Sequence, residues 1–178
     1  MKSVFRQFSL QALLLGIMTL TATTSMPVQA VEIPSAEDLT KVAQIARDKN
    51  LPIILVYSAD HCTYCEILEN EILKPMIVSG DYTDRVLIYK LNIDDTMEIH
   101  DFDGKEISVS DFSMNHDVFV TPTMLFLDAN GNELHERILG INTVGLFGGR
   151  VDKAIELSLA KLRKHRHKVA NNQAITLP

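Results

Sequence analysis

Cysteine is scarce in this chain of 178 residues, which contains only two. So few cysteines exclude a disulfide-built scaffold, and a chain of this length can bury enough core to fold without one. The two cysteines, Cys62 and Cys65, stand in the stretch "VYSADHCTYCEILENEIL" with the spacing C-x-x-C. No second C-x-x-C, internal repeat or low-complexity stretch accompanies them. Any special chemistry of sulfur must therefore come from this one pair.

A hydrophobic run long enough to anchor the N-terminus in a membrane is also missing. The apolar run at 10–20 is shorter than the roughly 20 residues that span a bilayer. It follows Lys2 and Arg6 and precedes the small-x-small exit "VQA", an arrangement typical of a secretory signal peptide. We therefore expect residues 1–30 to be a signal peptide that is cleaved after Ala30, which predicts a periplasmic or otherwise exported protein. No cysteine stands at the cleavage point, so lipid attachment is not expected there.

Basic residues are also fewer than acidic residues in this chain. Without Lys2 and Arg6, the mature chain keeps 15 of the 17 basic residues against 23 acidic ones, a formal charge of −8. This balance argues against a nucleic-acid surface, because binding phosphates requires clustered Lys and Arg. The one basic cluster, "KLRKHRHK" at 161–168, is interpreted as a solvated helix end, where cations favour the helix dipole.

Apolar residues divide the mature chain into alternating helices and strands. Helical spacing predicts helices at about 35–48, 62–76, 108–114 and 147–162. Short apolar runs predict strands at 51–59, 85–94 and 123–128, the first two buried in a parallel sheet, and Asn130-Gly131 predicts a hairpin turn into 133–139. This order predicts an α/β domain with a central mixed sheet and helices on both faces.

Finer features set the boundaries of these elements. Ser35, followed by Asp38, resembles a capping box at the start of the first helix. Pro75 should end or kink the helix that contains the cysteines. We expect one domain at 31–165 and a flexible C-terminal tail at 166–178. Residues 95–118 give no clear pattern beyond the short helix.

The position of the two cysteines favours a reactive dithiol. Cys62 follows a buried strand and opens a helix, where free N–H groups and the positive end of the helix dipole favour the nucleophilic thiolate. Cys65 lies on the same helical face, within an apolar stripe that includes Leu68 and Ile72. Cys62 is therefore expected to attack and the more buried Cys65 to resolve the mixed disulfide. In an oxidising compartment, a Cys62–Cys65 disulfide is expected unless a donor reduces it.

Over residues 36–163 the sequence resembles the thioredoxin superfamily, through "PIILVYSADHCTYC", "VFVTPTMLFLDANGNE" and "ILGINTVGLFGGRVDKAIELSL". The resemblance implies a thioredoxin-like fold in which a cis Pro122 faces the dithiol. It also implies that Thr121 binds an extended substrate segment by strand addition. The stretch "CTYCEILENEILKPMIV" looks like the exported SoxW-type branch.

This resemblance implies a thiol–disulfide oxidoreductase without a cofactor. Thr121 before the proline and Tyr64 between the cysteines are more similar to periplasmic disulfide isomerases and reductases than to oxidases. The separate dimerisation domain of the isomerases is absent here, which favours plain reduction over isomerisation. A monomer is expected. The implied partners are protein disulfides and a membrane or soluble electron donor for re-reduction.

Three departures from cytosolic thioredoxin limit what the resemblance implies. His61 replaces the Trp before the first cysteine, and Thr63-Tyr64 replaces Gly-Pro between the two cysteines. Val56 occupies the position of the buried acid that assists proton transfer from the second cysteine, so Cys65 must use solvent, His61 or another group.

The roles of the neighbouring side chains are left open. His61 either stabilises the thiolate of Cys62 as an imidazolium or only borders the substrate groove, and Tyr64 is expected to line that groove. Glu66 and Glu69 lie within two turns of Cys62 and are expected to oppose its thiolate.

Two alternatives use the same cysteines. Cys62 and Cys65, with His61 and a distant histidine, could bind copper(I) or zinc in a metal-delivery protein. Adjacent residues such as His61 and Cys62 can hardly reach one tetrahedral ion together, so no metal site is predicted. The second alternative is a purely structural disulfide, whose short loop would stabilise the fold only slightly.

Overall fold

The computed structural model of the protein describes residues 31–176, so the predicted signal peptide at 1–30 lies outside the described part. A sheet of four strands is its centre, in the order β2-β1-β5-β6. β1 pairs with β2 in parallel and with β5 antiparallel, and β5 pairs antiparallel with β6. The strands are β1 (Ile53–Ser58), β2 (Leu87–Asn92), β5 (Thr123–Leu127) and β6 (Glu133–Leu139). The predicted mixed sheet is thereby confirmed.

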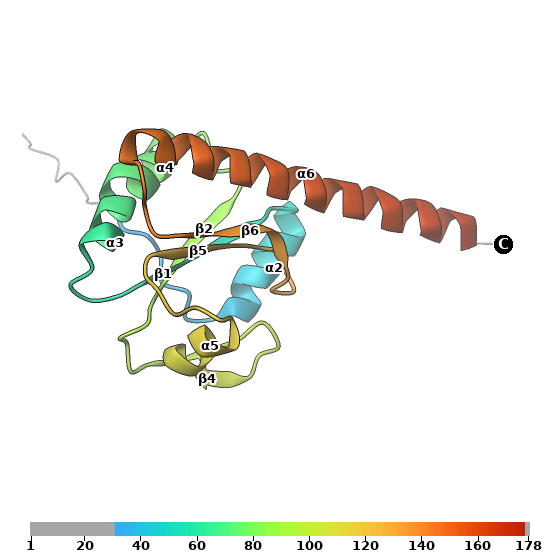
Figure 1. Cartoon of the computed structure of the whole chain (residues 1–178). Helices are drawn as coiled ribbons and strands as arrows, with labels where there is room; N and C mark the ends of the chain where they lie inside the picture. The colour runs from blue at the N-terminus through green and yellow to red at the C-terminus, as the bar shows by residue number, and fades with distance from the viewer. Residues whose placement is uncertain (1–30, 177–178) are drawn as a thin grey trace, which may run out of the picture. The chain divides into compact units, whose positions relative to one another are not determined.

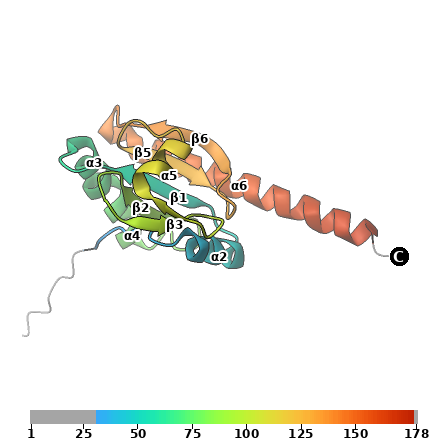
Figure 2. The ribbon, with the colours of Figure 1, turned by 90° about the horizontal axis from the view of Figure 1, so that it is seen from below.

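Helices cover both faces of this sheet (Figures 1 and 2). The side chains of β1 alternate between the two faces, and all six residues of the strand are buried. Leu55 and Tyr57 belong to the apolar cluster formed with the helices on one face, and Ile54 and Val56 belong to the cluster on the other. The first face carries α2 (Leu39–Lys49) and α5 (Val109–Asn115), and the second carries α3 (Thr63–Leu68), α4 (Lys74–Ser79) and α6 (Val144–Thr176).

The first helix begins later than its predicted cap. Asp38, not Ser35, is the N-cap of α2, and its carboxylate accepts hydrogen bonds from the backbone N–H groups of Thr40 and Lys41. The side-chain hydrogen bond from Thr40 contributes most to holding the pKa of Asp38 far below its usual range. Ser35 instead forms an isolated bridge with Lys90. A capping carboxylate nearer the helix thus replaces the predicted serine.

The helix that carries the cysteines is irregular in the turn before Pro75. A π-helical turn, η1 (Glu69–Leu73), joins α3 to α4, and the helix runs on to Ser79. Because proline lacks an N–H group, it cannot continue the regular bonding pattern, and a widened turn is one way to accommodate it. Of the two predicted effects of Pro75, an end or a kink, the helix does not end there, and its irregularity is a π-helical turn just before the proline.

The second strand differs from its prediction. β2 is an edge strand in which only Ile88 and Leu91 are buried, whereas the sequence suggested a fully buried strand. The following segment forms a short hairpin of β3 (Glu98–His100) and β4 (Glu106–Ser108) before the predicted helix α5. This hairpin was not predicted, because strands of three residues are too short to show an alternating pattern.

The C-terminal part of the domain follows the predicted order. The β5–β6 hairpin contains Gly131 in a left-handed conformation with φ of 80°, and the side chain of Asp128 accepts hydrogen bonds from the backbone of Asn130 and Asn132. α6 continues to Thr176, so a helix occupies most of the segment predicted as a tail at 166–178. Among residues 31–176, no helix combines the length and apolar character needed to cross a membrane.

Candidate active site

The dithiol lies where the central strand ends and a helix begins. Cys62 is the N-cap of α3, and its sulfur accepts a hydrogen bond from the backbone N–H of Cys65 at 3.2 Å. The two cysteines form a disulfide with a Cα–Cα separation of 5.2 Å. Cys62 is partly exposed, whereas Cys65 is 2% exposed. Cys62 is thus the more exposed of the two cysteines and Cys65 is enclosed, as the helical pattern predicted.

The loop before Cys62 is anchored to the end of β2. The backbone N–H of Asp60 donates to the carboxylate of Asp94 at 2.7 Å, and the side-chain amide of Asn92 donates to Asp60 at 2.8 Å. His61 adopts a left-handed backbone with φ of 54°, a conformation in which histidine is several-fold enriched among non-glycine residues. These contacts place Cys62 at the start of the helix.

The segment before β5 lies against the dithiol. The hydroxyl of Thr121 donates to the sulfur of Cys62 at 3.6 Å, and the Thr121–Pro122 peptide bond is cis. Pro122 is buried, and its carbonyl accepts a hydrogen bond from the backbone N–H of Gly140 at 2.8 Å. Thr121 and Cys62, 59 residues apart in sequence, therefore share one surface.

Exposed apolar side chains accompany this surface. Tyr64, between the two cysteines, is 59% exposed, and Phe119 and Val120, just before Thr121, are 75% and 51% exposed. Exposed side chains of this size next to a reactive group are typical of a site that contacts another molecule. The assignment of Tyr64 to a substrate groove stays a prediction.

Beside the disulfide lies a polar hollow of about 310 Å³, and Cys65 and His61 line it together with several charged side chains. Glu69 is one of them, although it is only 13% exposed. Its carboxylate accepts a hydrogen bond from the hydroxyl of Ser58 at 3.2 Å and pairs with the ammonium group of Lys90 at 3.0 Å. The expectation that Glu69 acts only as a charge opposing Cys62 neglects this pairing with a cation.

Sequence interpretation missed Lys90 and Ser58 as parts of the site. Lys90 is the register partner of Val56, the residue at the position of the missing acid, in the parallel β1–β2 pair. Glu69 was recognisable in principle, since it follows Cys65 by four residues and so lies on the same helical face. The position of Lys90 depends on strand register, which this sequence pattern does not determine.

The described part of the chain contains no set of side chains arranged as metal ligands. Within residues 31–176 no group of three or more His, Cys, Asp and Glu side chains is arranged to hold a metal ion. Cys62 and Cys65 are joined to each other, so neither offers a thiolate to a metal in this state.

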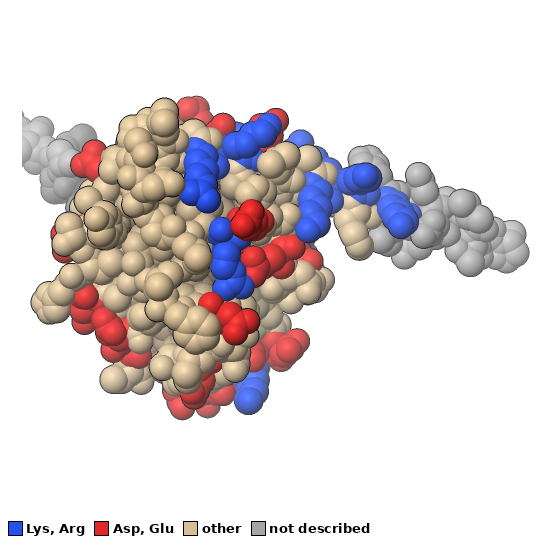
Figure 3. Space-filling model, viewed as in Figure 1, with Lys and Arg blue, Asp and Glu red and all other residues tan. Residues whose placement is uncertain are grey.

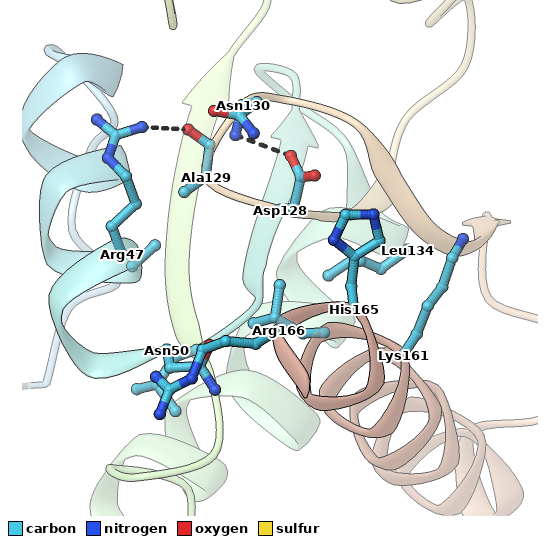
Figure 4. Close-up of a pocket in the computed structure, with 12 residues that line it drawn as sticks. Arg47, Asn50, Asp128, Ala129, Asn130, Leu134, Lys161, His165 and Arg166 are labelled. Carbon is cyan, nitrogen blue, oxygen red and sulfur yellow. Dashed lines mark hydrogen bonds between the residues drawn. The ribbon is translucent and has the colours of Figure 1, made fainter. Parts of the chain in front are cut away.

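A larger hollow of about 510 Å³ lies at the other end of the sheet, beyond the start of β1 and the end of β5. Figure 4 shows Arg47 from α2 on one side and Lys161, His165 and Arg166 from α6 on the other. Figure 3 shows basic side chains gathered along the α6 side of the surface. No cysteine lines this hollow, so it is separate from the dithiol.

Together, a central mixed sheet, a C-x-x-C disulfide at a helix start and a Thr-Pro segment against it define a redox protein of the dithiol type. The family model described as a thioredoxin-like domain matches residues 39–154. The chain belongs to this thioredoxin-like family. The family and the disulfide support thiol–disulfide exchange as the chemistry of the site.

Solved structures agree with this fold. The DsbH oxidoreductase is 16% identical, with a TM-score of 0.54, over 76% of this chain and 93% of DsbH. A poplar thioredoxin h variant is also 16% identical, with a TM-score of 0.50, over 74% of this chain and 90% of its own. At such identities the likeness shows the fold alone. A comparison with curated proteins found no match, and the SoxW-type assignment stays a prediction.

Proposed function

We propose that this protein is an exported protein-disulfide reductase that exchanges the Cys62–Cys65 dithiol with disulfides of other proteins. The observation that carries the proposal is the pairing of one partly exposed cysteine, Cys62, with one enclosed cysteine, Cys65, beside Thr121. A structural disulfide does not require a partly exposed cysteine with exposed apolar side chains nearby.

In the proposed reaction, the Cys62 thiolate attacks one sulfur of a substrate disulfide. A Cys62–substrate bond forms, the substrate S–S bond breaks, and the leaving thiolate takes a proton. The thiolate of Cys65 then attacks Cys62, forming the Cys62–Cys65 disulfide and releasing the second substrate thiolate. Two electrons pass from the dithiol to the substrate, and an external dithiol donor restores the reduced protein.

Several features support a protein substrate. Tyr64, Phe119 and Val120 expose apolar surface near Cys62, which a polypeptide can cover. We propose that an extended substrate segment lies along the backbone at Thr121, by strand addition, and that His61 and Tyr64 border this segment. Export rests on the signal-peptide pattern of residues 1–30.

The test is insulin reduction by the mature chain, residues 31–178, with dithiothreitol as donor. We expect catalysis of insulin precipitation well above the rate with dithiothreitol alone. The potential of the Cys62–Cys65 pair is then measured against glutathione, where the family spans roughly −270 to −120 mV. Failure to reduce insulin would overturn disulfide exchange with proteins, and a potential at the oxidising end would overturn the direction. A fusion of residues 1–30 to a reporter that functions only after export tests localisation.

A further inference from the structure

We infer that the carboxylate of Glu69 accepts the proton of the Cys65 thiol when Cys65 resolves the mixed disulfide. This inference rests on the proposed function, since it concerns the second step of that reaction. It assigns a proton acceptor in a chain that has Val56 where cytosolic thioredoxin has a buried acid.

The enclosed position of Cys65 creates the need for a base. Only the thiolate attacks a disulfide, and an apolar environment favours the neutral thiol. Cys65 is 2% exposed and lies on α3 next to the core residue Leu68. Cys65 lines the polar hollow of about 310 Å³, whose volume exceeds that of a water molecule about tenfold. This hollow offers its proton a polar exit.

Glu69 is suited to receive this proton. It follows Cys65 by four residues, so the two side chains lie on one helical face, and both line the hollow. The backbone N–H of Glu69 donates to the carbonyl of Cys65, which holds the two residues in a fixed relation. A single water between carboxylate and thiol suffices for transfer.

The surroundings keep the carboxylate in place and balance its charge. Ser58, from the end of β1, donates to one oxygen at 3.2 Å, and Lys90, from β2, pairs with the other at 3.0 Å. Both partners belong to the sheet on which the helix packs. They therefore orient Glu69 independently of the segment that connects β1 to Cys62. The other titratable side chains that line the hollow are Asp60, His61, Glu66 and Lys74.

The alternative acceptors are placed less well. Asp60, His61 and Glu66 are exposed, so they lie where the hollow meets solvent. Glu66 directly follows Cys65, and neighbours in a helix do not face each other. Among the acids that line the hollow, only Glu69 has a largely enclosed carboxylate and also lies on the same helical face as Cys65.

The proton that Cys65 loses in this step has a defined path. The Cys65 S–H bond breaks, the proton passes to Glu69, and the sulfur attacks Cys62 as a thiolate. The departing substrate thiolate or solvent then takes the proton from Glu69, which returns to its carboxylate form. No co-reactant is needed beyond the substrate disulfide.

Rapid mixing of the reduced protein with less than one equivalent of 5,5′-dithiobis(2-nitrobenzoate) separates the two steps. The first thionitrobenzoate release reports attack by Cys62, and the second reports resolution by Cys65. In Glu69→Gln we expect an unchanged first phase and a second phase slowed about a hundredfold at neutral pH, the size of a typical general-base contribution. In this variant the rate of the second phase should increase with pH, and it should reach its plateau at a higher pH than in the unaltered protein.

Glu71→Gln is the matched control, because Glu71 is an exposed acid of the same helical turn and does not line the hollow. It should leave both phases unchanged. In Glu69→Ala, added acetate should accelerate the second phase, which a merely structural role of Glu69 does not predict.

An unchanged second phase and pH profile in Glu69→Gln would overturn the inference, and so would a slowed second phase in His61→Asn at unaltered Glu69. Loss of the first phase in the unaltered protein would instead overturn the proposed function. The two failures are therefore distinguishable.

Discussion

The two ends of the sheet carry hollows of opposite character. At the end where β1 stops, a polar hollow of about 310 Å³ touches Cys65 and the paired side chains Glu69 and Lys90. At the other end, a hollow of about 510 Å³ combines apolar walls such as Leu51 and Leu134 with the basic groups of α2 and α6. The larger hollow contains no group that can transfer electrons, and the smaller one adjoins the disulfide.

The difference shows that cavity size does not locate the chemistry of this fold. The reactive end is the connection between β1 and α3, where the N–H groups of the first helical turn lie beside the sulfur of Cys62. The other end is defined by the β5–β6 hairpin and the passage of α6, which serve the packing of the domain. Substitutions at the two ends should therefore separate redox activity from stability.

The largest expected effect comes from the cysteines themselves. Cys62→Ser should abolish insulin reduction and trap few substrates, because the accessible nucleophile is lost. Cys65→Ser should also lose turnover but accumulate covalent complexes through Cys62, because the resolving thiol is missing. Non-reducing electrophoresis with mass spectrometry measures both. Trapping through Cys65 would show that the roles of the two sulfurs are reversed.

A smaller effect is expected from the apolar surface beside Cys62. Phe119→Ser should raise the KM for insulin about fivefold to tenfold, the loss expected for a contact residue of an interface. It should not alter the reaction with the small disulfide 5,5′-dithiobis(2-nitrobenzoate), which does not need this surface.

Leu157→Ser is the matched control, since Leu157 is 44% exposed and lies more than three turns into α6. An equal rise of KM in both variants would remove the surface of Phe119 and Val120 from substrate binding.

How much of this could be predicted depends on the range of the interactions. β1 and α2 were predictable because their patterns are local: a continuous apolar run and a helical stripe. The edge position of β2 and the hairpin of β3 and β4 depend on which segments meet in space. A pattern within one segment does not contain that information.

The same limit applies to the site. Cys62 and Cys65 were identified from their spacing and from the strand-to-helix boundary just before Cys62. The structure places Thr121 beside Cys62, and the substrate-binding role that the family resemblance implied for Thr121 stays a prediction. Glu69 was interpreted as a repulsive charge, because its partner Lys90 comes from a strand whose register with Val56 is a tertiary property. A charged side chain can be interpreted only together with its partners.

At the other end of the sheet, stability rather than activity should respond. Gly131→Ala should lower the free energy of unfolding by more than the roughly 1–2 kcal/mol of a left-handed alanine, because a Cβ atom there would lie 2.9 Å from the ring of Phe102. Gly80→Ala is the control: φ is also positive, at 74°, but no atom lies within 4 Å of its Cβ position. Urea unfolding of the oxidised proteins measures both. Equal losses would show that the contact with Phe102 relaxes freely.

The smallest effect is expected from the basic groups of the larger hollow. Arg47 donates to the carbonyl of Ala129 at 2.8 Å, and Lys161 donates to the carbonyl of Glu133 at 3.2 Å, so Arg47→Ala and Lys161→Ala each remove one exposed contact. The free energy of unfolding should fall by about 1 kcal/mol or less.

The length of β1, roughly 20 Å, separates these charges from Cys62, and salt screens exposed charges beyond about 8 Å. Insulin reduction should therefore change less than twofold in either variant, whereas Glu69→Gln, which also removes one charge, should slow the resolving step strongly. A several-fold loss of insulin reduction in Arg47→Ala or Lys161→Ala, without loss of the reaction with the small disulfide, would show that protein substrates reach the second end of the sheet as well.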